Sequence, residues 1–120
     1  MLFRSRYSTN TFPTWPLAQP FRMLAHNGEI NTVKGNQNWM KSHEIRMTAD
    51  AFGADDGLVK PVIQPGGSDS AALDNVFEVL VRAGRPAPMV KALLMPEAAS
   101  PKMKPEHAAL YAYCNAVMES

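Results

Sequence analysis

The stretch SDSAALDNVFEVLVRAGR, residues 68–85, carries the clearest helix pattern in this chain of 120 residues. Its apolar side chains recur every three or four positions, which places them on one face of an α-helix. Polar side chains at residues 68–70 can cap the first turn, and Gly84 can end the helix. The pattern predicts a helix over residues 70–83, with an apolar face formed by Leu73, Val76, Phe77, Leu80 and Val81.

Three further helices are predicted on either side of this one. Residues 32–47 form the first, although Gly35 lowers its helix propensity. The other two cover residues 88–95 and about 105–118, and both begin with proline, which is favoured in the first turn. Their apolar sides are formed by Trp39, Met40, His43 and Met47 in the first helix and by Leu110, Tyr113, Cys114, Val117 and Met118 in the last.

Two short strands are predicted before the helices. Residues 2–8 alternate in polarity as a strand does, and residues 21–26 have a suitable composition. The intervening residues 10–20 hold three prolines and are predicted to be a loop, as are residues 48–67. Because two strands make no stable sheet and leave unpaired edges, we expect the chain to be part of a larger α+β domain.

Length, charge and cysteine content narrow the class of protein. The net charge is +1 and the basic residues are spread along the chain, which gives no sign of a nucleic-acid or membrane partner. A single cysteine excludes an internal disulfide and is typical of a reducing compartment. No apolar run is long enough to span a bilayer. The composition therefore predicts a cytoplasmic domain.

Three polar clusters carry potential chemistry: Arg6, the pair Asn27-Gly28, and Asp69. An arginine can hold a carboxylate through two parallel hydrogen bonds, and an aspartate can accept hydrogen bonds from an ammonium group. An asparagine amide beside a glycine N–H can direct two donors at one oxygen, which is the composition of an oxyanion hole. Together the clusters fit glutamine, which has a carboxylate, an ammonium group and a side-chain amide.

Each residue also fits a simpler role when it is taken alone. Arg6 is equally typical of a solvated strand position, and Asp69 of a helix N-cap. Asn27-Gly28 is typical of a hairpin turn, although a helix pattern rather than a second strand follows it. The three histidines are far apart and lack metal-ligand spacing, so no metal site is predicted; they are His26, His43 and His107.

A resemblance to a known family favours the chemical interpretation. RYSTNTFPTWPLAQPFRMLAHNGEINTVKGNQNWM, residues 6–40, closely resembles the glutaminase domain of the glutamate synthase large subunit, a class II glutamine amidotransferase. The segments SDSAALDNVFEVLVRAGR, LLMPEA and YCNAVME look like later parts of the same domain, in the same order. The resemblance implies an N-terminal-nucleophile hydrolase fold, a four-layer αββα sandwich, of which this α+β chain would be an internal fragment truncated at both ends.

The resemblance also implies a role for each polar cluster. Arg6 would bind the α-carboxylate of glutamine, and Asp69 its α-ammonium group. Asn27 and Gly28 would form the oxyanion hole. The family attacks the amide with an N-terminal cysteine, whereas this chain begins with Met1-Leu2 and its one cysteine, Cys114, lies in a predicted helix. We therefore expect the chain alone to be inactive.

Cofactors and partners follow from the same resemblance. Glutamate synthase hydrolyses glutamine and uses the ammonia for reductive amination of 2-oxoglutarate. The resemblance implies FMN, an iron–sulfur cluster and NADPH or ferredoxin on other domains, with none of them in this chain. Glutamine, the rest of the amidotransferase domain and the synthase domains are the implied partners. Two alternatives stay open: a glutamine-binding or regulatory module, and a non-functional or split-enzyme fragment that needs a partner chain.

Overall fold

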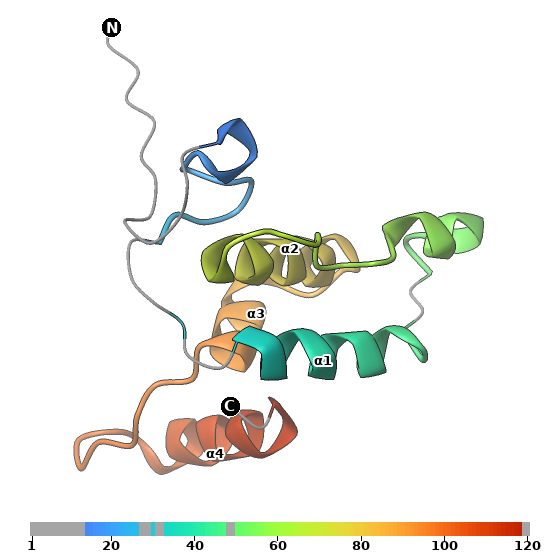
Figure 1. Ribbon diagram of the computed structural model, residues 1–120. Coiled ribbons are helices and arrows are strands. Elements are labelled where there is room, and N and C mark those ends of the chain that lie inside the picture. The colour runs from blue at the N-terminus through green and yellow to red at the C-terminus, as the bar shows by residue number, and fades with distance from the viewer. Residues whose placement is uncertain (1–13, 27–29, 31–32, 48–49, 119–120) are drawn as a thin grey trace, which may run out of the picture.

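The computed structural model describes residues 14–26, 30, 33–47 and 50–118 of the chain, and within them it is built from helices and loops (Figure 1). These residues form four α-helices and two short 3₁₀ helices. In chain order they are η1 (Trp15–Leu17), α1 (Val33–Glu44), η2 (Gly53–Val59), α2 (Asp69–Arg82), α3 (Ala87–Leu94) and α4 (Pro105–Met118).

Helix α2 is capped at both of its ends. The Ser68 hydroxyl accepts a hydrogen bond from the Ala71 N–H at 3.1 Å, which satisfies one of the free donors of the first turn. At the other end Gly84 has a φ of +101°, which favours glycine. The N–H groups of Gly84 and Arg85 donate to the carbonyls of Val81 and Leu80, as in a Schellman motif.

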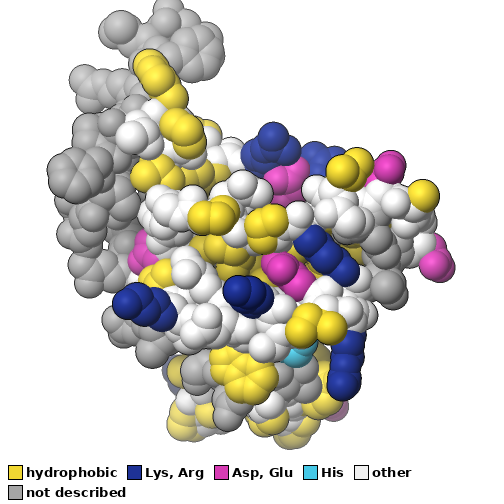
Figure 2. All heavy atoms as spheres, turned by 45° about the vertical axis from the view of Figure 1, so that its right-hand side comes forward, with side chains coloured by type: hydrophobic (Ala, Val, Ile, Leu, Met, Phe, Trp, Pro, Cys, Tyr) yellow, Lys and Arg dark blue, Asp and Glu magenta, His cyan; other side chains and the backbone are white. Residues whose placement is uncertain are grey.

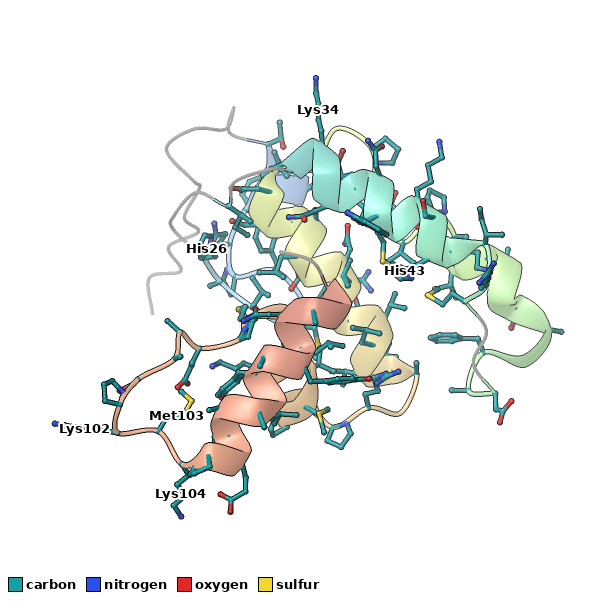
Figure 3. The ribbon with its side chains drawn as sticks, turned by 90° about the horizontal axis from the view of Figure 1, so that it is seen from below. His26, Lys34, His43, Lys102, Met103 and Lys104 are labelled. Carbon is teal, nitrogen blue, oxygen red and sulfur yellow. The ribbon has the colours of Figure 1, made fainter. Side chains whose placement is uncertain are left out.

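The helices pack in sequence, α2 against α3 and α3 against α4. The loop between α3 and α4 leads away from the packed helices, and its exposed Lys102 and Lys104 point outward (Figure 3). The end of α1 is tied to the segment after η2, where the Val62 N–H donates to the Glu44 carboxylate at 2.7 Å. Among the described residues, the buried apolar side chains are Val62, Val90, Ala92 and Cys114.

The structure has helices in all four ranges where the sequence predicts them. Helices α2, α3 and α4 lie close to the predicted ranges 70–83, 88–95 and 105–118, whereas α1 is shorter than the predicted range 32–47. Cys114, predicted to lie on the apolar side of the last helix, is buried. The two 3₁₀ helices lie in segments for which the sequence predicts loops.

The prediction of an α+β sandwich is wrong for the part of the chain that the structure describes, which contains helices and no strand. Residues 21–26 turn instead of extending, because the Phe21 N–H donates to the Leu24 carbonyl and closes a tight turn. The N–H groups of Arg22, Met23 and Leu24 donate to a carboxylate of α2 rather than to a neighbouring strand. The other predicted strand, residues 2–8, lies outside the described residues.

Much apolar surface of the described residues remains accessible. Figure 2 shows hydrophobic side chains reaching the surface in several places among Lys and Arg side chains. The apolar face of α2 is only partly buried along its length. None of the helices in the described ranges is both long and apolar enough to cross a bilayer.

Candidate functional site

The most buried face of α2 is polar. Ser70, Asp74 and Glu78 follow one another at four-residue spacing, so they form one line along the helix. Their relative exposures are 0%, 3% and 9%, lower than those of the apolar side chains on the same helix. Since buried polar groups need hydrogen-bond partners, this line must be covered by a segment that supplies donors.

Asp74 receives those donors from the backbone of residues 22–24. Its Oδ1 atom accepts hydrogen bonds from the N–H groups of Met23 at 2.8 Å and Leu24 at 3.0 Å. Its Oδ2 atom accepts from the Arg22 N–H at 3.3 Å. One carboxylate therefore holds three successive peptide groups, about fifty residues away in the chain.

His26 is held from two sides. Its backbone N–H donates to the Gln19 side chain at 2.7 Å, and its carbonyl accepts from the Gln19 amide at 2.6 Å. Its ring atom Nδ1 lies 2.8 Å from the Ser70 hydroxyl. The segment that leads into Asn27 is thus attached to the first turn of α2.

Asp69 is the first residue of α2, and it binds the backbone on the far side of residues 27–29. Its Oδ2 atom accepts from the Ile30 N–H at 2.6 Å, and its Oδ1 atom accepts from the Ser70 N–H at 2.6 Å and the Ser70 hydroxyl at 3.2 Å. Partial burial opposes ionisation of Asp69, but these hydrogen bonds and the nearby His26 outweigh it and lower the pKa. The carboxylate is therefore ionised at neutral pH.

Glu78 completes the line with two ion pairs. Its Oε1 atom lies 2.8 Å from Arg82 Nε, one turn along α2, and 3.2 Å from Arg22 Nη1. Burial raises the pKa of Glu78, but the hydrogen bonds and positive charges of Arg82 and Arg22 prevail and lower it. Ionised Glu78 therefore stabilises both α2 and the attachment of residues 22–24.

A pH dependence of stability follows from this lowered pKa. An acid that is stronger in the folded state stabilises the fold fully above its ordinary pKa, here 4.5, and the contribution is lost as the pH falls. We expect the free energy of unfolding to decrease below about pH 4.5. Urea titrations at several pH values should show a weaker decrease in Glu78→Gln. An equally steep decrease in Glu106→Gln and Glu78→Gln would contradict the prediction, because Glu106 is an exposed control on α4.

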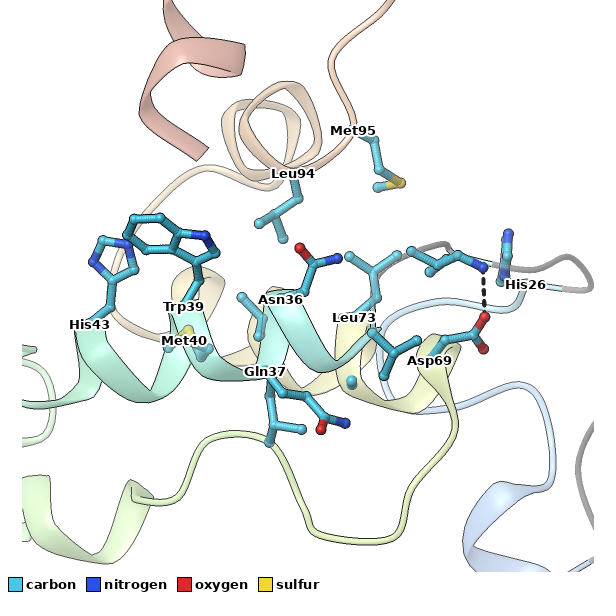
Figure 4. Close-up of a pocket in the computed structure, with 15 residues that line it drawn as sticks. His26, Asn36, Gln37, Trp39, Met40, His43, Asp69, Leu73, Leu94 and Met95 are labelled. Atoms are coloured by element: carbon cyan, nitrogen blue, oxygen red, sulfur yellow. Dashed lines mark hydrogen bonds between the residues drawn. The ribbon is translucent and has the colours of Figure 1, made fainter. Parts of the chain in front are cut away.

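A cavity of about 270 Å³ lies between α1, α2 and the end of α3. Asp69 and His26 are at one end, and Trp39 and His43, with ring centroids 6.1 Å apart, are at the other (Figure 4). Small-molecule sites of proteins commonly measure about 300–1,000 Å³. At about 270 Å³ the cavity is near the lower end of this range, which suits a small metabolite. Most of its wall is apolar. The apolar lining residues are Ile30, Val33, Met40, Ile63, Ala72, Leu73, Val76, Leu94 and Met95.

Asp69 determines which chemical group this end of the cavity can bind. An ionised carboxylate offers about four lone-pair positions, and three are taken by the Ile30 N–H and the two donors of Ser70. Among the described residues no donor takes the fourth position, which is on Oδ2. A primary ammonium group is a suitable ligand, because a charged donor gives the stronger hydrogen bond to a carboxylate.

Of the predicted site residues, Asp69 is described by the structure, whereas Arg6, Asn27 and Gly28 lie outside the described residues. The structure brings together Asp69 and the two described neighbours of residues 27–29, which are His26 and Ile30. Asp69 is not the N-cap, since Ser68 has that role.

The sequence does not predict the roles of four further residues at the site, Gln19, Ser70, Asp74 and Glu78. The four-residue spacing of the last three is visible in the sequence and places them in a line beside the apolar face of α2. The sequence alone does not show that these three side chains are buried, because the segment that covers them, which includes residues 22–24, lies far away in the chain.

Comparisons with known proteins match the whole length of the chain. A family model described as class-II glutamine amidotransferases matches residues 1–120. The chain is 67% identical over 120 residues to the glutamate synthase [NADPH] large chain of Azospirillum brasilense, covering 98% of this chain and 8% of that protein. It is 46% identical over 120 residues to the glutamate synthase [NADPH] large chain of Bacillus subtilis, with 98% and 8% covered.

A plant relative gives a similar result over a shorter range. Ferredoxin-dependent glutamate synthase 1 of Arabidopsis thaliana is 48% identical over 97 residues, which cover 81% of this chain and 6% of that protein. The chain therefore spans less than a tenth of the length of these relatives.

Proposed function

Because the chain belongs to the class-II glutamine amidotransferases, we propose that its residues supply the substrate-binding side of a glutaminase site in a glutamate synthase. In this proposal glutamine is hydrolysed to glutamate and ammonia, and other domains use the ammonia to aminate 2-oxoglutarate. The observation that carries the proposal is the ionised Asp69 at the end of a cavity, with one lone-pair position to which none of the described residues donates.

In this division of roles, two polar groups bind the substrate and two stabilise the transition state. Asp69 accepts the α-ammonium group of glutamine, and Arg6 binds the α-carboxylate. Asn27 and Gly28 donate to the amide oxygen, and they act most strongly when that oxygen carries negative charge in the tetrahedral intermediate. The attachment of His26 and Ile30 to α2 supports this division, because it holds both flanks of residues 27–29 beside Asp69.

The attacking thiol does not come from the helical part of the chain. Cys114, the single cysteine among the 120 residues, is 2% exposed on α4. A buried thiol in a structural position is a poor nucleophile. We therefore propose that the family's N-terminal cysteine acts from a part of the parent domain beyond these residues. The parent's electron carriers, FMN, an iron–sulfur cluster and NADPH or ferredoxin, belong to its other domains in the same proposal.

A chimeric enzyme tests the proposal directly. Residues 1–120 would replace the matching stretch of the Azospirillum brasilense large chain, which is 67% identical over that range. We expect the chimera to release glutamate and ammonia from glutamine at a rate within about tenfold of the parent. A folded chimera that releases neither product, beside an active parent, would reject the proposed function.

A further inference from the structure

Asp74 stands out among the buried side chains of α2 because its hydrogen-bond partners in the described part of the chain all come from one distant segment. Its carboxylate accepts three successive backbone N–H groups, those of Arg22, Met23 and Leu24. At 3% exposure it is almost fully withdrawn from water. A buried carboxylate is costly unless it is fully hydrogen-bonded, so the conformation of residues 22–24 and the position of Asp74 are strongly coupled.

We infer that Asp74 is a positioning residue for the glutaminase reaction, acting through the backbone that leads from residue 22 to Asn27. The inference rests on the proposed function. Asp74 fixes the start of this short segment, and Gln19 fixes His26, the residue directly before Asn27. Because only a few peptide units separate Leu24 from Asn27, we expect a shift at Leu24 to disturb the position of the oxyanion-hole donors.

This role predicts a particular kinetic signature. The substrate-binding carboxylate is Asp69, which is attached to Ile30 and Ser70 rather than to residues 22–24. Greater freedom of residues 22–24 should therefore leave intact the proposed contact between Asp69 and the bound glutamine. Since oxyanion-hole donors act mainly in the transition state, a change at Asp74 should lower kcat and leave KM nearly unchanged.

The test compares Asp74→Asn and Asp74→Ala in the chimeric enzyme. Asparagine keeps one acceptor oxygen, which can serve Met23 and Leu24, whereas alanine removes all three hydrogen bonds. We expect kcat for glutamine hydrolysis to fall about tenfold in Asp74→Asn and further in Asp74→Ala, with KM within about twofold, because a small misplacement of catalytic groups is costly.

Val90→Ala is the matched control, since Val90 is 0% exposed and lies on α3. It should lower the thermal stability without changing kcat per folded enzyme. In the 120-residue chain itself, amide hydrogen exchange should become faster at Met23 and Leu24 in Asp74→Ala and stay slow there in Val90→Ala.

The outcomes separate this inference from the proposed function. If the chimera without a substitution is folded but inactive, the glutaminase proposal is rejected. If that chimera is active and kcat is unchanged in both Asp74 variants, only the role of Asp74 is rejected. A rise in KM at constant kcat would also overturn it, because Asp74 would then affect substrate binding. Equal losses of kcat in Asp74→Asn and Val90→Ala would show a general effect of stability and overturn it as well.

Discussion

Replacing Asn27 with alanine in the chimeric enzyme should reduce kcat for glutamine hydrolysis by about 10²–10³-fold, the usual cost of losing one oxyanion-hole donor. The side-chain amide is one of two donors that we propose for the amide oxygen of glutamine, and the other is the Gly28 N–H. The developing negative charge strengthens this hydrogen bond, so the loss should fall on the transition state. KM should therefore change by less than about threefold.

Asn115→Ala is the matched control for this substitution. Asn115 is an exposed asparagine on α4, so the same chemical change there should leave both kcat and KM unaltered. Steady-state kinetics with glutamine and ammonia detection would measure both parameters. If Asn27→Ala kept more than a tenth of the parental kcat, the oxyanion-hole assignment would be wrong.

The helices could be predicted from the sequence because their signals are local. The apolar stripe of α2, its capping serine and Gly84 all lie within one continuous stretch, and the structure uses them as expected. The turn at residues 21–26 could not be predicted in the same way. Its composition suits a strand, but its N–H groups are satisfied by Asp74, a contact that no local pattern encodes.

The site was predictable to the extent that it depends on motifs. The chemistry of Asp69 and its place in a family motif mark it as a site residue, and it lies where a cavity ends. Gln19, Ser70 and Asp74 carry no comparable signal, because their importance comes from partners that the fold brings to them. Residues that touch a ligand tend to form motifs, whereas residues that hold a backbone in place become recognisable only through their hydrogen bonds.

Substrate recognition should depend most on Asp69. We expect Asp69→Asn to raise KM for glutamine in the chimera by about 10–100-fold, since a hydrogen bond to a charged group contributes about 1.5–3 kcal/mol. The effect on kcat should be smaller, because the α-ammonium group keeps its charge throughout the reaction. Asp55→Asn, the same change at an exposed position of η2, should leave KM unchanged.

A substrate analogue tells binding of the ammonium group apart from a general disturbance of α2. Asp69 also accepts the Ile30 N–H, so its replacement can alter the local backbone and affect every substrate. Glutaramate has the amide and the carboxylate of glutamine but lacks the α-amino group. The chimera without a substitution should have a much higher kcat/KM for glutamine than for glutaramate. Asp69→Asn should lower the ratio of these two values by about tenfold or more. An unchanged preference would show that Asp69 shapes the site without contacting the ammonium group, because a structural disturbance lowers the activity toward both substrates alike.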